Sequence, residues 1–475
     1  MPLILPGNVA TATASTTYDV ANSVRMDGSS SYMTKTLGTP TDIDKYTFSF
    51  WCKRAKIGAQ QSIFRSTNDA ASNDSHVTFQ ADDTLRFEEY GGGATIGKLQ
   101  TNQVFRDVMA WYHIVLVYDS ANGTAGNRMR MYVNGAEVTS FGTDTNPSQN
   151  ADSYFNKSGE VLSFGRTPYS GGSTYFNGYV AELVMCDGQA YAASDFGEFD
   201  SDSPKIWKPK DVSGLTFGNN GFYLDFEASG NLGNDANGGT DFSESGLAAI
   251  DQTTDTCTNN FCTFNPLIKQ DHAFSEGNLK YTSSASDWDC GIATIPFSSG
   301  KWYMEQKITA VVGGIVRTGI GICDVRDQNL IAENEFGYKP SGAVGDSIGY
   351  NDNAVHKNDS AQSGSWGDMD NGDVAQMAVD LDNSAVYFGL NGTWGNSGDP
   401  TSGASKTGAI GFTAGQTYVS GAIGYGGGAV EQNWGNPVSA LSSGNADANG
   451  YGDFEYAPPS GYYALCTKNL GEFGG

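Results

Sequence analysis

Basic residues are scarce in this chain. It carries 27 Lys and Arg residues against 53 Asp and Glu residues, which gives a formal net charge of −26 at pH 7. A nucleic-acid-binding face needs cations that replace phosphate counter-ions, and an anionic membrane surface would repel so acidic a protein. We therefore expect no nucleic-acid partner. An acidic surface that keeps the protein soluble at high ionic strength is the simplest interpretation, and metal binding by acidic loops is the alternative.

Paired cysteines and long apolar runs are also missing. The seven cysteines are odd in number and form no Cys-x-x-Cys pair, which disfavours both a disulfide framework and a zinc knuckle. No segment approaches the roughly 20 apolar residues of a membrane span. The opening "MPLILPGNVA" has no basic residue ahead of its apolar run, unlike a signal peptide. We predict free, buried thiols, synthesis in a reducing cytoplasm and no membrane insertion.

Catalytic motifs are absent as well. The sequence contains neither the HExxH pattern of zinc proteases nor the GxSxG elbow of serine hydrolases. Its four histidines are isolated, and His113 lies within the apolar run "WYHIVLVYD", where a hydrogen-bonded strand residue is the expected role. We therefore predict that the protein is not an enzyme and has no catalytic residues.

Glycine and aromatic residues are abundant instead. Gly accounts for 62 of 475 residues and aromatic residues for 12% of the chain. Runs such as "YTFSFWCK" (46–53) and "WYHIVLVYD" (111–119) have the β-branched and aromatic character of buried strands, and turn residues separate them at short intervals. A chain of this length exceeds one ordinary core, so these features predict several β-sheets divided between two or three domains.

One hairpin pattern occurs twice. "MRMYVNGAEV" (129–138) and "AVYFGLNGTW" (385–394) each read as a strand, an Asn-Gly pair and a return strand. Asn-Gly favours a type I′ turn, because both residues tolerate the positive φ that this turn requires. The flanking sequences differ, which predicts two separate β-sandwiches without requiring an internal duplication.

Two families resemble these regions. "VRMDGSSSYM", "YTFSFWCK", "MYVNGAEV" and "FNGYVAELVMCDG" resemble successive pieces of a laminin-G-like domain of the concanavalin A-like lectin fold, over about residues 18–199. "GKWYMEQKI", "VRTGIGICD", "AVYFGLNGTW" and "EQNWG" resemble a SPRY domain, over about residues 274–436. The resemblances imply an all-β class with two concanavalin A-like and SPRY-like antiparallel β-sandwich (jelly-roll) domains joined by an extended arm.

The expected organisation has five parts. Residues 1–17 form an apolar, Pro-bounded N-terminal arm that could anchor the protein to a particle, 18–200 the laminin-G-like sandwich, 201–270 an extended linker arm, 271–440 the SPRY-like sandwich, and 441–475 a Gly- and Pro-rich tail.

At the scale of the whole chain, segments such as "LQTNQVFRDVMAWYHIV", "GFYLDFEASGNLGNDANG" and "AIDQTTDTCTNNFCTFNPL" resemble virion structural proteins of marine bacteriophages, cyanophages included. The resemblance implies a tail-fibre-like or adhesin-like protein on the virion surface, synthesised in the host cytoplasm. Its partners would be other virion proteins of the capsid or tail and a host surface glycan or receptor. We expect a homo-oligomer, with a trimer as one form.

Two rival functions stay open. The first is a purely architectural capsid or tail decoration without a ligand. The second is a glycan depolymerase. Glucanases of this fold place their carboxylates along one strand in an ExDxxE-like run, and "FEEY", "WYMEQ" and "ENEFG" do not give that spacing, which disfavours the enzyme.

Candidate binding residues come from the loops. An exposed aromatic ring can stack on a sugar face, and the candidates for this role are Tyr169, Tyr175, Trp288, Trp366 and Trp394. Carboxylates in the Asx-Gly stretches could supply oxygen ligands to Ca²⁺; these are Asp235, Asp241, Asp368, Asp370 and Asp373. Solvated turns are the commoner role of such stretches, so we expect no cofactor, with Ca²⁺ as the one ion that the loops would suit.

Overall fold

The chain divides into two compact units, each described here by itself. The computed structural model describes residues 18–67, 73–168, 174–268, 272–284, 287–313, 316–326, 335–339 and 344–474. We call the part up to Thr258 the first sandwich and the part from Asn259 the second sandwich. The predicted N-terminal arm, residues 1–17, lies outside the described residues.

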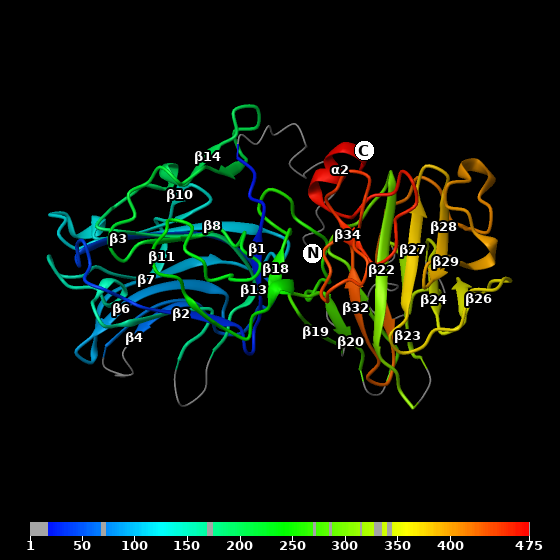
Figure 1. The fold of residues 1–475 in the computed structure, drawn as a ribbon, viewed down its shortest axis with the longest axis horizontal. Coiled ribbons are helices and arrows are strands. Elements are labelled where there is room, and N and C mark those ends of the chain that lie inside the picture. The colour runs from blue at the N-terminus through cyan, green and yellow to red at the C-terminus, as the bar shows by residue number, and fades with distance from the viewer. Residues whose placement is uncertain are drawn as a thin grey trace. The chain divides into compact units, whose positions relative to one another are not determined.

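The first sandwich consists of two eight-stranded antiparallel sheets (Figure 1). The first sheet has the order β10 (Ala136–Glu137), β9 (Met129–Val133), β8 (Trp111–Asp119), β3 (Lys45–Arg54), β13 (Asn177–Asp187), β1 (Ser23–Asp27) and β18 (Gln252–Thr253), with β16 (Phe222–Leu224) paired to β13. The second sheet has the order β11 (Phe141–Thr145), β7 (Ala94–Val104), β6 (Thr84–Gly91), β5 (Asp74–Phe79), β4 (Gln61–Thr67), β12 (Val161–Phe164), β2 (Tyr32–Thr36) and β17 (Ser243–Ser245). Smaller elements are β14 (Gly197–Phe199), β15 (Trp207–Pro209), η1 (Ala125–Asn127), η2 (Tyr154–Asn156), η3 (Ala193–Asp195) and η4 (Ala249–Asp251).

Alternating side chains build the core of the first sandwich. In the second sheet, Phe64, Val77, Phe87 and Leu99 are cross-strand neighbours on four successive strands, and all four belong to the buried core. The rings of Phe64 and of Phe48, on the opposing sheet, stack with centroids 4.7 Å apart. The two sheets therefore pack face to face through their apolar rows, as period-two alternation predicts.

The second sandwich has an eight-stranded and a six-stranded sheet. The larger has the order β19 (Ala273–Ser275), β20 (Lys280–Thr282), β32 (Ala429–Asn433), β22 (Lys301–Ala310), β27 (Val374–Asp380), β28 (Ala385–Leu390) and β29 (Thr393–Trp394), with β30 (Ile410–Gly411) paired to β28. The smaller has the order β21 (Asp289–Ile292), β31 (Tyr418–Gly424), β23 (Thr318–Asp324), β24 (Ser347–Asn351), β25 (Ala354–Lys357) and β26 (Ser360–Ala361). Smaller elements are β33 (Asn445–Ala446), β34 (Asp453–Phe454), η5 (Gly395–Ser397), η6 (Gly403–Ser405) and α2 (Thr467–Phe473).

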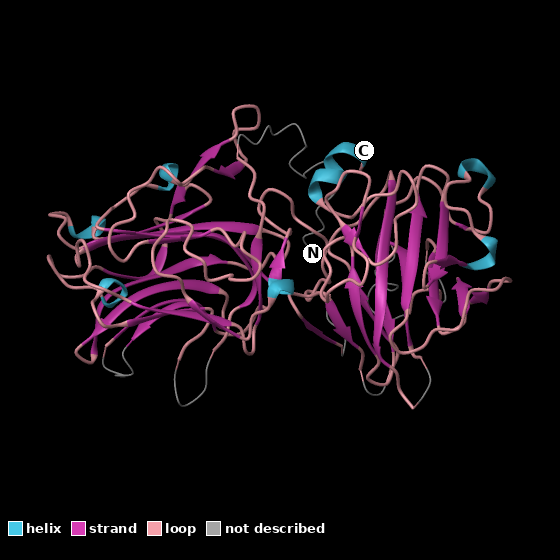
Figure 2. Ribbon diagram, viewed as in Figure 1, coloured by secondary structure: helices cyan, strands magenta, loops and turns pink. Residues whose placement is uncertain are grey.

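The predicted all-β class is confirmed. Strands make up most of the regular structure of both sandwiches, and the few helical segments are short (Figure 2). No helix in the described part of the chain is long and apolar enough to cross a membrane. All seven cysteines are described and carry free thiols, and six of them are buried, as predicted.

Both Asn-Gly hairpins form as predicted. Asn134 and Gly135 have φ angles of 47° and 78°, and Asn391 and Gly392 have φ angles of 49° and 80°. In each turn the Asn side chain accepts a hydrogen bond from a strand N–H, that of His113 at 2.8 Å in the first sandwich and of Val374 at 2.9 Å in the second. The two positive φ angles are those of a type I′ turn.

The segment predicted as a linker arm, 201–270, does not form a separate part of the fold. Its strands β16, β17 and β18 pair with strands of both sheets of the first sandwich, and the boundary between the two units falls after Thr258. Phe217 and Tyr223 from this segment also cover Val184 on the outer face of the first sheet. The apolar residues of the segment find more area to bury on that face than in an extended linker.

The predicted C-terminal tail, 441–475, is likewise part of the second sandwich. Phe454, Tyr462 and Cys466 pack on the outer face of the larger sheet, against Tyr303 and Tyr387. The tail thus covers the outer face of a sheet in the second sandwich, just as residues 201–258 do in the first.

Candidate functional site

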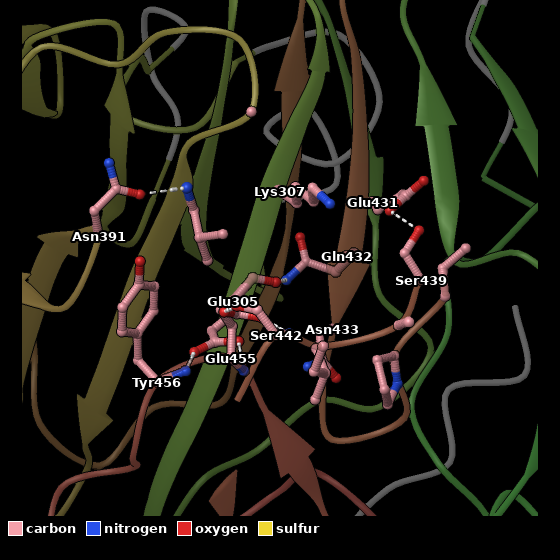
Figure 3. A pocket seen from close by; sticks show the side chains of 16 residues that line it. Glu305, Lys307, Asn391, Glu431, Gln432, Asn433, Ser439, Ser442, Glu455 and Tyr456 are labelled. Atoms are coloured by element: carbon pink, nitrogen blue, oxygen red, sulfur yellow. Dashed lines mark hydrogen bonds between the residues drawn. The ribbon is translucent and has the colours of Figure 1, made fainter. Parts of the chain in front are cut away.

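A pocket of about 300 Å³ opens in the second sandwich, on the outer face of the larger sheet (Figure 3). Its base is formed by β22 and β32, one side by the hairpin of β27 and β28, and the other sides by the segments that follow β32 and β34. The lining residues are Glu305, Lys307, Gly372, Val374, Asn391, Glu431, Gln432, Asn433, Pro437, Val438, Ser439, Ala440, Leu441, Ser442, Glu455 and Tyr456.

Glu305 is the most buried acid of the pocket. Its carboxylate accepts hydrogen bonds from the Tyr303 hydroxyl at 2.7 Å and from the backbone N–H groups of Glu455 and Tyr456, both at 2.8 Å. Burial raises the pKa of Glu305 to about 7, although these donors work in the opposite direction. Glu305 therefore ties the segment after β34 to the sheet.

The other two acids of the pocket are oriented by serines. The Ser439 hydroxyl donates to Glu431 at 2.6 Å. The backbone N–H of Ser442 donates to Glu455 at 2.9 Å, and its hydroxyl donates to the same carboxylate. These contacts hold the loop after β32 against its neighbours and fix the carboxylates as hydrogen-bond acceptors.

Lys307 and Tyr456 complete the chemistry of the pocket. Lys307 follows Glu305 by two positions on β22, so both side chains lie on the same face, and Lys307 is exposed. Tyr456 is half-buried beside the Asn391–Gly392 turn, where a Cβ on Gly392 would come within 2.8 Å of the phenol ring. The pocket thus combines one ammonium group, three carboxylates, several amides and hydroxyls and one aromatic ring, a set suited to a hydroxyl-rich ligand.

The predicted aromatic residues do not gather at this pocket. Tyr169 lies outside the described residues. Tyr175 is half-buried and forms an isolated bridge with Arg166. Trp366 is 3% exposed and packs edge-on to Phe388, so its ring has no free face for a sugar.

Trp394 and Trp288 occupy different surroundings. Trp394 is half-buried and contacts Tyr303 edge-on. Trp288 is 36% exposed, and its ring centroid lies 5.4 Å from that of Tyr425, which Arg317 in turn covers. Of the predicted aromatic residues within the described chain, Trp288 therefore has the most accessible ring for stacking.

Two of the predicted metal ligands form a turn in the first sandwich. Asp235 is buried, accepts the backbone N–H of Tyr223 at 3.0 Å and lies 3.5 Å from the Lys35 ammonium group. Asp241 accepts the N–H of Asp235 at 3.0 Å and the Asn231 amide at 2.9 Å. Both carboxylates therefore accept hydrogen bonds from the protein, and the second oxygen of Asp235 faces the Lys35 ammonium group.

The other three lie in the loop before β27. Asp373 accepts the backbone N–H of Asp370 and the side-chain amide of Asn391, each at 2.7 Å, whereas Asp368 is exposed. Over the described ranges, no group of three or more His, Cys, Asp or Glu side chains is arranged to hold a metal ion. Of these acids, Asp235 forms an Asx turn by accepting the backbone N–H of Asn237 at 3.1 Å.

His113 is a hydrogen-bonded strand residue, as predicted. The Trp207 indole N–H donates to its Nδ1 at 2.9 Å, and its Nε2 lies 2.9 Å from the Ser49 hydroxyl. Burial lowers the pKa of His113 to about 3, so the ring is neutral. Because an indole can only donate, the ring proton is assigned to Nε2, which donates to Ser49. A general base needs a lone pair at that nitrogen, so this Ser-His contact is not a nucleophile–base pair.

The pocket itself was not predicted from the sequence. Glu305 and Tyr456 lie about 150 positions apart, and Tyr456 falls in a segment expected to be a tail. The aromatic residues around "FEYAPPSGYY" were the available signal, because so many rings in a short segment favour packing over a free tail.

One family model matches part of the first sandwich. Residues 27–192 match the family described as the concanavalin A-like lectin/glucanases superfamily. A search of curated proteins gave no significant match.

Three solved structures overlap parts of the chain. A SAP-like pentraxin from Limulus polyphemus shares 17% identity, with 37% of this chain and 80% of that chain covered and a TM-score of 0.29. The SPRY domain of human HERC1 shares 16% identity, with 36% and 96% covered and a TM-score of 0.28. Domains LG4-5 of the mouse laminin alpha1 chain share 9% identity, with 85% and 82% covered and a TM-score of 0.30. The family match thus makes residues 27–192 similar to concanavalin A-like lectins and glucanases.

Proposed function

We propose that this protein is a non-enzymatic surface protein of a bacteriophage virion, of the fibre or adhesin type, and that the pocket beside Tyr456 binds a neutral host glycan. The observation that carries the binding role is the pocket itself. Oriented carboxylates, an ammonium group, amides and one aromatic ring line the same pocket, so sugar hydroxyl groups would find donors and acceptors and a sugar face would find the phenol.

Charge favours a neutral ligand in this pocket. Three glutamates face one lysine, so an acidic sugar would meet a surplus of negative charge. The lectin-containing superfamily matched by residues 27–192 supports a binding role for the protein in general. The virion location and the homo-oligomeric state are supported by the sequence resemblance to marine phage structural proteins.

The binding role can be tested with the full chain on an array of neutral hexose and N-acetylhexosamine oligosaccharides. We expect Tyr456→Ala to weaken the strongest interaction by about tenfold. The variant removes the ring that would stack on the sugar and its hydroxyl group, and a loss of about 1.4 kcal/mol of binding free energy is tenfold in affinity. Tyr456→Phe, which keeps the ring, should retain most of the affinity. Trp288→Ala serves as an off-pocket control, and a loss confined to this variant would place the site at Trp288 instead.

The rival functions give different results. A depolymerase would release new reducing ends from host polysaccharide, and one carboxylate substitution would abolish the release. An architectural protein would bind no oligosaccharide on the array. The virion location is tested by antibody labelling of intact particles in electron microscopy, where absence of label would contradict it.

A further inference from the structure

A row of charged side chains crosses the second sheet of the first sandwich. Arg65, His76, Glu88 and Lys98 are direct cross-strand neighbours on β4, β5, β6 and β7. Each follows or precedes by one position a member of the apolar row that faces the core, so all four lie on the opposite, outer face of the sheet. We call this set, together with Asp74 and Arg86, the charged row.

Glu88 is the centre of the charged row. Its Oε2 lies 3.2 Å from His76 Nε2, 3.5 Å from Arg86 Nε and 3.6 Å from Lys98 Nζ, while Thr95 donates to its Oε1 at 2.9 Å. Burial acts to raise the pKa of Glu88, but its contact with His76 and the surrounding charges outweigh burial and hold this pKa at about 2. Glu88 is therefore an ionised carboxylate that orients two cationic side chains.

The charged row carries surplus positive charge. Its cations are Arg65, Arg86 and Lys98, and its carboxylates are Asp74 and Glu88, so three positive charges meet two negative ones. His76 is not counted among the cations, because burial lowers the pKa of its imidazole and so disfavours the charged form. One net positive charge stands out on a chain whose formal charge is −26.

The surplus charge lies on the accessible side. The side chains of Arg86 and Lys98 are 20% and 22% exposed, whereas those of Glu88 and Asp74 are 8% and 6% exposed. The two cations are therefore more accessible to a ligand than the carboxylates of the charged row. A guanidinium and an ammonium group that share one carboxylate partner can both donate hydrogen bonds to the oxygens of a ligand carboxylate or sulfate.

We propose that Arg86 and Lys98 on this sheet face form a second binding site, for the anionic group of an acidic saccharide, either the carboxylate of a uronic acid or a sulfate ester. The site lies in the first sandwich and takes a charged ligand, so it is independent of the neutral-glycan pocket beside Tyr456. Glu88 acts as a positioning residue that holds both cations in place and partly neutralises them.

The test is calorimetric titration of the full chain at low ionic strength with three probes: an oligoglucuronate, a sulfated galacto-oligosaccharide and a neutral galacto-oligosaccharide. At least one acidic probe should bind, and its affinity should fall as the salt concentration increases. Any binding of the neutral probe should not show this salt dependence. Which acidic probe binds more tightly distinguishes uronate from sulfate. Arg86→Gln/Lys98→Gln should weaken the interaction by at least about tenfold, since each charge-assisted hydrogen bond contributes more than a neutral one.

Two further variants separate recognition from structure. Glu88→Gln removes the counter-charge while keeping size and shape, so it should tighten acidic-probe binding severalfold, which loss of folding would not do. Lys56→Gln, at an exposed lysine of the same sandwich, should leave acidic-probe binding unchanged. Absence of binding by both acidic probes, equal weakening by Lys56→Gln, or weaker binding by Glu88→Gln would overturn the proposal.

Discussion

The two sandwiches cover their Asn-Gly turns in the same way, but their proposed binding surfaces carry surplus charge of opposite sign. Each has an Asn-Gly hairpin, and in each an aromatic ring from a later segment covers the turn: Trp207 over Gly135 and Tyr456 over Gly392. The two proposed binding surfaces differ in charge, with surplus cations on the sheet face of the first sandwich and surplus carboxylates in the pocket of the second. Similar folding devices thus leave the surface chemistry free to diverge.

A buried glutamate forms a second parallel. Glu182 of the first sandwich lies at the bulge in β13, with a φ of 49°, and accepts hydrogen bonds from the Tyr18 and Tyr223 hydroxyls, each at 3.0 Å. Burial raises its pKa to about 7, as it does for Glu305. In both sandwiches a buried acid on a central strand therefore holds a distant segment, through Tyr18 in the first and through the backbone of Glu455 and Tyr456 in the second.

The largest expected effect concerns the two turn glycines. A Cβ at Gly135 would come within 2.4 Å of Trp207, against 2.8 Å between a Cβ at Gly392 and Tyr456. With the cost of positive φ added, Gly135→Ala should lower the free energy of unfolding by about 4 kcal/mol and Gly392→Ala by about 2 kcal/mol. Hydrogen exchange measured during denaturant unfolding would show which sandwich loses stability in each variant.

Gly123→Ala is the matched control, because Gly123 has open space around its Cβ position and no positive φ. It should leave both sandwiches unchanged. Equal effects of Gly135→Ala and Gly392→Ala would show that the covering rings do not distinguish the two hairpins.

The second prediction uses the buried glutamates. A pKa raised from 4.5 to about 7 means that the folded state holds a proton that the unfolded state releases, so stability falls as pH rises through this range. Glu305→Gln removes that loss, and its stability relative to the parent should increase from pH 4.5 to pH 7 by up to about 3 kcal/mol. Glu182→Gln should do the same for the first sandwich.

Urea unfolding at pH 5 and pH 7.5 measures both effects. The increase should be confined to the second sandwich for Glu305→Gln and to the first for Glu182→Gln. A difference from the parent that stays constant with pH would contradict the raised pKa values.

The smallest effect compares two tryptophans. The Trp207 indole N–H donates to His113, whereas the buried indole N–H of Trp366 has no hydrogen-bond partner in the described part of the structure. Phe substitution removes similar volume at both sites, but only Trp207→Phe leaves a buried acceptor without its donor. It should destabilise by about 1.5 kcal/mol more than Trp366→Phe in thermal unfolding, and equal losses would argue against the role given to this hydrogen bond.

Local signals predicted the strands and turns of this protein. The continuous apolar run "WYHIVLVYD" and the Asn-Gly pairs act through local backbone geometry, so β8, β9, β28 and both turns could be expected from sequence. Loop aromatics were harder to assign, because Trp366 and Trp288 have the same chemistry and differ only in burial, which distant strands determine.

The all-β class, the free thiols and the acidic surface were thus determined by the sequence alone, since composition and short-range periodicity suffice for them. The pocket and the charged row were decided only by tertiary structure. Glu305 meets the backbone of Tyr456 through long-range packing, and cross-strand register places His76 beside both Arg65 and Glu88. A shift of one residue in that register would turn every side chain of the row to the other face, so such sites depend on contacts that no local pattern encodes.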